Sequence, residues 1–276
     1  MPASDYHTHT PLRLHAEGEP EAFVQKALAL GMSVYGIADH APMPPAREPF
    51  DAWRMRCAEL PQYLRWIERA KKAAKGTGLT ILAGLECDWL PGIEPWVGLL
   101  RQEYDWDYLI GSVHYLGERG SVDDALFANA CITGSTKGDW QAYWQAVLAM
   151  VQSGLFDIVG HIDLVKIWGR YPAGELMRYY EPTLSALEGS GLVVELNTAG
   201  WHKPCAEQYP AAAFLQQLLH RRIPVAINSD AHQPAHLCRD RERALTLLTE
   251  LCGGNLCEYT TPALHSKTPL TVYGPL

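Results

Sequence analysis

The sequence predicts an α/β fold, a distorted (βα)7 TIM-like barrel in a single domain over residues 1–276. Short apolar runs alternate along the chain with longer segments of helical period, the pattern of repeated βα units. Runs such as Val193-Val194-Glu195-Leu196 lack a clean apolar–polar alternation, as is typical of parallel strands covered on both faces. About seven such units without a Gly/Ser-rich linker favour a barrel over the alternative, an open doubly wound sheet.

The expected strands are short segments, most of them rich in aliphatic residues, at 5–9, 33–38, 80–85, 108–113, 157–160, 192–196 and 224–228. Helices are expected between them, at 19–30, 51–75, 93–103, 139–153, 173–189, 207–221 and 239–251. The helical period is clearest in 51–75, where three- to four-residue spacing relates Trp53, Leu60, Leu64, Ile67 and Ala70. Glu19-Pro20 and Gly31 fit the start and the end of the first helix.

Composition excludes several classes of protein. The formal net charge of −8 makes the chain a poor nonspecific partner for polyanions, so we expect no binding to nucleic acid. No run of about 18 apolar residues is present, so we expect no membrane span. The N-terminus has no basic or apolar stretch, and none of the seven cysteines forms a Cys-x-x-Cys pair. We therefore expect a cytoplasmic protein with reduced thiols and no thiolate zinc site.

Almost every expected strand ends at a histidine or an acidic residue. The ends carry His7 and His9, Asp39-His40, Glu86, His114, His161, and Asp230 with His232, whereas the sixth strand ends at Asn197. The carboxyl ends of parallel barrel strands lie on one face, where active sites are built. We therefore expect these residues, far apart in the chain, to converge at one mouth of the barrel.

The converging side chains are those of a metal site without thiolates. His7 and His9 are two residues apart, so both side chains point the same way in an extended strand, and the same spacing relates Asp230 and His232. Imidazoles and carboxylates suit Zn²⁺, Mn²⁺ or Fe²⁺. There are enough of them for two or three divalent ions, with Glu86 as the natural bridging carboxylate.

Simpler explanations exist for single residues. A lone histidine in an apolar run, such as His114 or His161, is more often a hydrogen-bonded core residue, but many unpaired acidic and imidazole groups at one buried mouth require cations. His220, His236 and His265 lie in helical or tail segments and are expected at the surface. Asp163 could orient a ligating histidine or cap a helix, and the sequence does not decide between the two.

Taken together, the motifs resemble those of the PHP (polymerase and histidinol phosphatase) family, and they match in order over nearly the whole chain. They are His7-Thr8-His9, Ala38-Asp39-His40, Gly84-Leu85-Glu86, Gly111-Ser112-Val113-His114, Gly160-His161-Ile162-Asp163 and Asn228-Ser229-Asp230-Ala231-His232. The segment Glu195–Gly200 with Lys203-Pro204 and Tyr209-Pro210 is similar to the histidinol-phosphatase branch. Residues 115–138 map onto no motif of that branch.

The resemblance implies a trinuclear metal centre. It would place His7, His9, Glu86 and Asp230 on one ion, and Glu86, His114 and His161 on a second. The third would be held by His15, His40 and His232; only the resemblance assigns His15, which would otherwise read as a loop histidine.

Phosphate ester hydrolysis suits such a centre, because paired ions lower the pKa of a bridging water and stabilise charge on phosphoryl oxygens. Glu86, Asp230 and His232 are the catalytic candidates. Lys166, His202 and Lys203 follow the fifth and sixth strands and are the candidate substrate contacts, although each could be an ordinary loop side chain.

The resemblance implies hydrolysis of L-histidinol phosphate to L-histidinol and phosphate, a step of histidine biosynthesis. One alternative is a PHP-type phosphoesterase acting on another small phosphate ester or a nucleotide. The other is a non-catalytic module that binds metal or phosphate.

Overall fold

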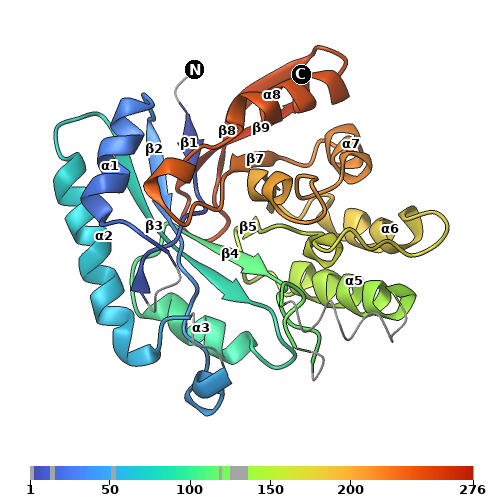
Figure 1. Ribbon diagram of the computed structural model, residues 1–276, viewed down its shortest axis with the longest axis horizontal. Helices are drawn as coiled ribbons and strands as arrows, with labels where there is room; N and C mark the ends of the chain where they lie inside the picture. Colours follow the sequence, from blue (N-terminus) through green and yellow to red (C-terminus); the bar gives the residue numbers. More distant parts are fainter. Residues whose placement is uncertain (1–2, 13–15, 51–53, 118–119, 125–135, 276) are drawn as a thin grey trace.

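The computed structural model describes residues 3–12, 16–50, 54–117, 120–124 and 136–275. Their strands form one curled sheet, and the helices cover its outer face (Figure 1). The strands are β1 (Ser4–Asp5), β2 (Val34–Ile37), β3 (Thr80–Asp88), β4 (Tyr108–Ser112), β5 (Ile158–Val159), β6 (Val193–Asn197), β7 (Val225–Asn228), β8 (Leu256–Pro262) and β9 (Pro269–Pro275). The helices are α1 (Pro20–Ala29), α2 (Leu60–Ala74), α3 (Glu94–Gln102), α5 (Thr136–Gln152), α6 (Met177–Leu187), α7 (Ala212–His220) and α8 (Arg241–Leu251).

Strands β1 to β7 are parallel and lie in sequence order, which confirms the single-domain α/β barrel. An open doubly wound sheet would reverse its strand order at a switch point, and no reversal occurs among β1 to β7. The carboxyl ends of β1 and β7 continue into a parallel bridge between Thr8 and Ala231. The His9 backbone N–H donates to the Ala231 carbonyl at 2.9 Å, so the curled sheet closes at its carboxyl mouth.

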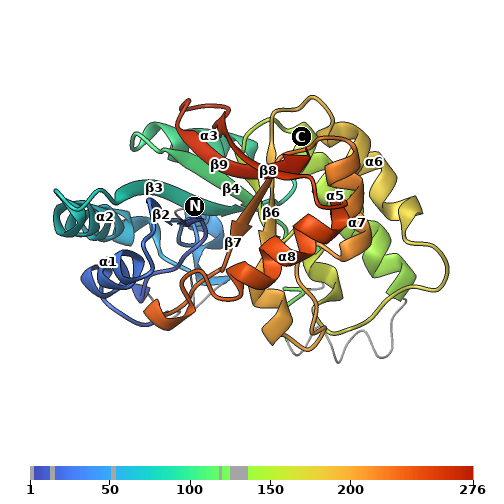
Figure 2. The ribbon, with the colours of Figure 1, turned by 90° about the horizontal axis from the view of Figure 1, so that it is seen from above.

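The C-terminal hairpin of β8 and β9 was not expected from the sequence. Both strands are antiparallel, and β9 pairs with β7 through Val225 and Tyr273, so the hairpin extends the sheet beyond the seventh unit (Figure 2). The sequence Leu-Cys-Glu-Tyr-Thr-Thr-Pro of β8 is polar and mostly exposed or half-buried, because β8 is an edge strand. A segment of this kind carries little of the apolar signal that marked the buried strands.

Side chains on β3 alternate between the two faces of the sheet. Ile81, Ala83, Leu85 and Cys87 belong to the core between the sheet and the helices, whereas Leu82 belongs to a separate core inside the barrel. The inner core also contains Tyr6, Tyr108, Ile110, Val193, Ala226, Leu270 and Val272. By the period of two, Glu86 and Asp88 lie on the same inner face as Leu82. The interior is therefore apolar at one end and polar at the carboxyl mouth.

A tyrosine fills the apolar end of the interior. The Tyr108 hydroxyl donates to the Tyr6 carbonyl at 2.5 Å, and the two rings meet edge to face. A Cβ added at Gly36 would lie 2.3 Å from the Tyr108 hydroxyl oxygen, and one at Gly84 would lie 2.6 Å from its ring. Because those contacts are too short for any side chain, glycine at both positions is what admits the tyrosine ring.

Several predicted segments have other bounds in the structure. Within the described residues, the helix expected at 51–75 begins only at Leu60, with Pro61 in its first turn, and 51–53 lie outside those residues. The helix expected at 207–221 begins at Ala212, because Tyr209 instead pairs with Asn197 in an isolated bridge. None of the helices described has the length and apolar character to span a membrane.

Candidate metal centre

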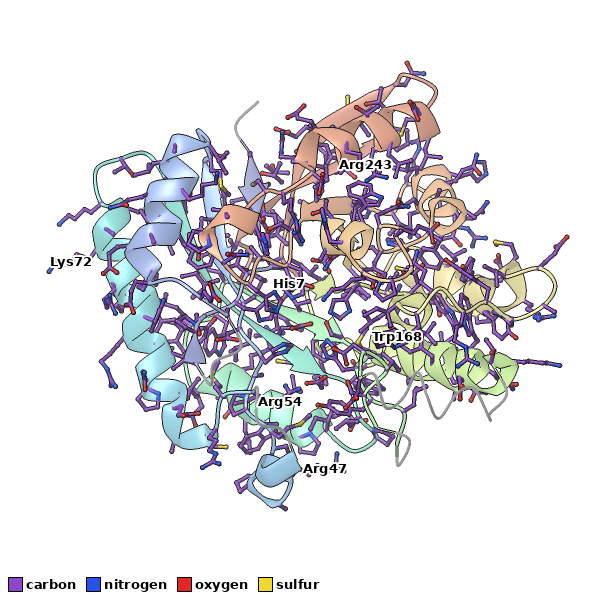
Figure 3. All side chains as sticks on the ribbon, in the orientation of Figure 1. His7, Arg47, Arg54, Lys72, Trp168 and Arg243 are labelled. Atoms are coloured by element: carbon purple, nitrogen blue, oxygen red, sulfur yellow. The ribbon has the colours of Figure 1, made fainter. Side chains whose placement is uncertain are left out.

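A cavity of about 230 Å³ lies at the carboxyl mouth of the barrel. Its described lining consists of His9, His40, Glu86, His114, Asp123, His161, Leu164, Ile167, Lys203, Tyr209, Asp230 and His232. Figure 3 labels His7 near the middle of the molecule, where the strands end. The side chains at the strand ends therefore lie together in the structure, as expected.

Glu86 is the central carboxylate of this mouth and is almost fully buried. Its Oε1 lies 2.9 Å from His161 Nε2 and 3.6 Å from His114 Nε2. Its Oε2 lies 2.9 Å from His40 Nδ1 and 3.4 Å from His7 Nε2. Each oxygen therefore faces a different pair of imidazoles, which is the arrangement that a bridging carboxylate requires.

Asp230 forms a second carboxylate position beside Glu86. Its Oδ1 lies 3.0 Å from His9 Nε2 and 3.8 Å from His7 Nε2. The expectation of an extended backbone here is wrong, because Asp230 has a φ of 52°, in the left-handed region. This turn still brings the side chains of Asp230 and His232 to His9. The His232 ring stacks on the His9 ring, with 4.2 Å between the ring centroids.

A buried glutamate that the ligand prediction did not include holds two of the histidines in place. Glu195 Oε1 lies 2.8 Å from His7 Nδ1, and the backbone N–H of His161 donates to Glu195 Oε2 at 2.7 Å. Asn197 donates to Glu195 at 3.3 Å and to Asp230 at 3.2 Å. A carboxylate behind a ligating imidazole fixes its tautomer and leaves the other ring nitrogen for a cation.

Two further carboxylates have the same relation to other histidines. Asp39 Oδ1 lies 3.3 Å from His9 Nδ1 and accepts the backbone N–H of His40. Asp88 Oδ1 lies 2.6 Å from His114 Nδ1, while Arg54 pairs with Asp88 Oδ2 at 2.5 Å. The spacing Glu86-Cys87-Asp88 was a usable signal, because two carboxylates two residues apart share one face of a strand. The strand was expected to end at residue 85, whereas β3 continues to Asp88.

The groups at the centre fit a cation. His7 Nε2 and Glu86 Oε2 are buried, lie 3.4 Å apart and make no hydrogen bond to any described residue. Burial raises the pKa of Glu86, but the charges of His40, His7 and His114 lower it more, well below its usual range. Two buried groups whose lone pairs face each other need a shared proton or a cation between them.

Among the residues that the structure describes, three sets of donor atoms are close enough to hold an ion. They are His7, His9 and Asp230; His7, Glu86 and His161; and His9, His40 and Glu86. All six are imidazole or carboxylate donors, and thiolates are absent from these sets, which favours Zn²⁺, Mn²⁺ or Fe²⁺ over softer metals.

Comparison with known proteins agrees with this geometry, because residues 5–199 match the PHP domain. The chain belongs to the PHP family. It is 40% identical to a probable histidinol-phosphatase of Deinococcus radiodurans over 84% of this chain and 87% of that one. It is 29% identical to the histidinol-phosphatase of Bacillus subtilis over 84% of this chain and 94% of that protein.

A solved structure has the same fold. Histidinol phosphate phosphatase from Lactococcus lactis, complexed with zinc, L-histidinol and phosphate, superposes with a TM-score of 0.73. The two chains are 22% identical, and the match covers 90% of this chain and 93% of the other.

In this PHP chain the donor sets differ in part from those that the resemblance implied. His40 lies with His9 and Glu86, not with His232, and His232 belongs to none of the three sets found among the described residues. His114 is near Glu86 but outside these sets. The expectation for His15 falls outside the described residues.

The three candidate substrate contacts lie in different surroundings. Lys203 is exposed and lines the cavity. His202 is a surface residue whose Nε2 lies 2.6 Å from Asp240, and it is not part of the cavity lining. Lys166 is fully buried and also outside that lining. Of the three, the geometry brings Lys203 alone to the cavity.

Three protein oxygens bind the Lys166 ammonium. Its Nζ lies 2.9 Å from both Asp163 Oδ2 and Glu207 Oε2 and donates to the Gln208 carbonyl at 2.7 Å. Asp163 thus neither orients a site histidine nor caps its own helix. It pairs with Lys166 and accepts the backbone N–H of Ala211 at 2.7 Å, just before α7.

Proposed function

We propose that this PHP chain, as one domain over residues 1–276, is a metal-dependent phosphomonoesterase that hydrolyses L-histidinol phosphate to L-histidinol and phosphate. The relatives with this activity in their names cover most of the chain, and one is 40% identical to it. The structural observation that carries the proposal is Glu86, whose two oxygens face different imidazoles at a buried mouth. A carboxylate that holds two ions close together lets both act on one water, as hydrolysis requires.

Two to three divalent ions, Zn²⁺, Mn²⁺ or Fe²⁺, are the proposed cofactors. The proposed ligands are the six residues of the donor sets, His7, His9, His40, Glu86, His161 and Asp230. His114 and His232, which line the same cavity, are added from the family resemblance, and His15 is assigned by that resemblance alone. Bound ions would supply a water nucleophile of lowered pKa and offset the charge of the phosphoryl group. The catalytic roles proposed for Glu86 and Asp230 are to hold these ions at the mouth.

Residues of the chain bind and orient the substrate. Lys203 lies on the cavity wall, where its ammonium can pair with a phosphate oxygen. Leu164, Ile167 and Tyr209 form an apolar part of the wall, which suits the carbon skeleton and ring of the leaving alcohol and limits water.

His232 is better suited to be a ligand than a proton donor. Its Nδ1 lies 2.8 Å from the Asp230 carbonyl, an acceptor, so Nδ1 carries the proton and Nε2 presents a lone pair. Burial and the charge of His9 lower the pKa of His232 to about 4. A neutral imidazole with Nε2 as an acceptor cannot deliver a proton from that atom to the leaving alkoxide.

The test is a substrate panel assayed on the protein loaded separately with Mn²⁺, Zn²⁺ and Fe²⁺. Histidinol phosphate should be hydrolysed with a kcat/KM at least about 10²-fold above that for p-nitrophenyl phosphate, since recognition of the alcohol part adds binding energy. Chelation should abolish turnover, and re-addition of metal should restore it. Equal rates on all monoesters would leave a general phosphatase, and preference for a diester or nucleotide would favour the other PHP activity.

A further inference from the structure

One carboxylate of the cavity has no place in the metal centre. Three acidic residues line the cavity, namely Glu86, Asp230 and Asp123. Glu86 and Asp230 belong to the donor sets close enough to hold an ion, whereas Asp123 belongs to none of those found in the described part of the chain. Asp123 is exposed, so its charge reaches the solvent-filled part of the cavity. A carboxylate placed there is available to a ligand.

The backbone that carries Asp123 is fastened to the metal side of the mouth. The preceding residue, Val122, is fully buried, and its N–H donates to the carbonyl of His114 at 2.7 Å. The Trp168 indole N–H donates to the Val122 carbonyl at 2.8 Å, and Figure 3 labels Trp168 on the α5 side of the molecule. Two hydrogen bonds to the backbone of Val122 therefore hold Asp123 in place, although Asp123 is itself exposed.

The carboxylate group has a defined orientation as well. The Ser121 hydroxyl donates to Asp123 Oδ1, and the same hydroxyl lies 3.3 Å from the His114 carbonyl. Among the residues described, no lysine, arginine or histidine forms an ion pair with Asp123.

Besides the residues of the metal centre, the cavity lining thus carries two side chains of opposite charge. Lys203 offers a cation for phosphate, and Asp123 offers an anion on the wall near His114. An anionic wall next to a phosphate site repels a simple phosphate ester, so it is useful only for a substrate that also carries a cation.

We propose that Asp123 binds the protonated amino group of the substrate and so selects phosphate esters of amino alcohols. The inference rests on the proposed function, since the amino group of histidinol phosphate is one carbon away from the ester-bearing carbon. With the phosphate at the ions and Lys203, the apolar wall of Leu164 and Ile167 takes the side chain, and the ammonium turns to Asp123. Asp123 is in this assignment a specificity-determining residue.

The experiment compares Asp123→Asn with wild type on four phosphomonoesters at equal metal loading. They are histidinol phosphate, its deamino analogue 3-(imidazol-4-yl)propyl phosphate, 2-aminopropyl phosphate, which lacks the imidazole, and propyl phosphate, which lacks both groups. Loss of a charge-assisted contact should lower kcat/KM for both amino-bearing esters by about 10- to 100-fold. The two esters without an amino group should lose much less. Asp124→Asn, a neighbouring exposed carboxylate outside the cavity lining, is the matched control.

Each outcome either supports or contradicts the role of Asp123. Metal content should equal that of wild type, which separates recognition from damage to the metal centre. Equal losses on all four esters, losses that follow the imidazole, or no loss on histidinol phosphate would each overturn the role of Asp123. The proposed function is judged separately, by the wild-type preference for histidinol phosphate over p-nitrophenyl phosphate. If that preference is absent, the ratio of 2-aminopropyl to propyl phosphate still decides whether Asp123 binds the amino group.

Discussion

Glu195 Oε1 lies 2.8 Å from Nδ1 of His7, while the opposite ring nitrogen of His7 faces Glu86 at 3.4 Å. The glutamate therefore holds the proton of His7 on Nδ1 and keeps Nε2 basic. We expect Glu195→Gln to remain folded but to bind metal about 10- to 100-fold more weakly, the usual cost of losing a partner behind a ligating histidine. A competitive chelator titration measures this affinity, and Glu250→Gln, at an exposed position, is the control. Unchanged affinity would show that Glu195 plays no part in metal binding.

Glu86→Gln tests the bridge directly. Glutamine has nearly the same size, but it removes one charge and replaces an anionic oxygen with an NH₂ that repels a cation. We expect a folded protein with an unchanged circular dichroism spectrum, fewer bound ions and a kcat lower by at least about 10²-fold. Elemental analysis and kinetics check both quantities, with His236→Ala, outside the cavity lining, as the control. Full metal content with near-normal turnover would mean that Glu86 is no bridge.

Lys166→Met should affect stability more than any surface lysine does. Methionine fills a similar volume but leaves Asp163 buried without its cation, and an unpaired buried charge costs about 3–5 kcal/mol. The free energy of unfolding from a denaturant titration should fall by about this amount. Lys72→Met, an exposed lysine on α2 labelled in Figure 3, should change it by less than about 0.5 kcal/mol. Similar losses in both variants would contradict the structural role of Lys166.

Metal uptake should depend steeply on pH. In the metal-free protein, burial lowers the pKa of His9. Hydrogen bonds to Asp230 and Asp39 raise it by more than burial lowers it, so the pKa is about 9. Burial lowers the pKa of His114 and the charge of Asp88 raises it, again to about 9. Both pKa values lie above the usual 6.5, so below pH 9 a cation must displace protons to bind. We expect apparent affinity to fall as pH falls from 9 to 6, with proton release at neutral pH measured by a pH indicator. Equal affinity at pH 6 and pH 8 would contradict this.

The sequence allowed the fold and the residues of the mouth to be predicted for a simple physical reason. Parallel strands end at one face, so a list of strand ends is also a list of neighbours in space, and His7, Glu86 and His161 were identified in this way. The carboxylates that orient the histidines were harder to predict from the sequence, because the contact of Glu195 with His7 depends on which strands are adjacent and in what register. That information is not local in the sequence.

Other failures have separate causes. Lys166 follows the same strand as His161, but its place depends on Asp163, three residues earlier, and on Glu207, which only the folded chain brings near. Strand β8 was missed because an edge strand is largely polar. Asp123 lies in a segment without a family motif, so no pattern marked it.

The Tyr108 ring that blocks the apolar end of the barrel has a kinetic consequence. With Tyr6 and Tyr108 packed beneath the metal centre, the described interior offers substrate and products one common opening. In the proposed binding mode the phosphate would lie against the ions, deeper than the alcohol, so the alcohol would depart first and inorganic phosphate last. The enzyme should accordingly show ordered release, with phosphate inhibiting competitively against substrate and the amino alcohol inhibiting noncompetitively.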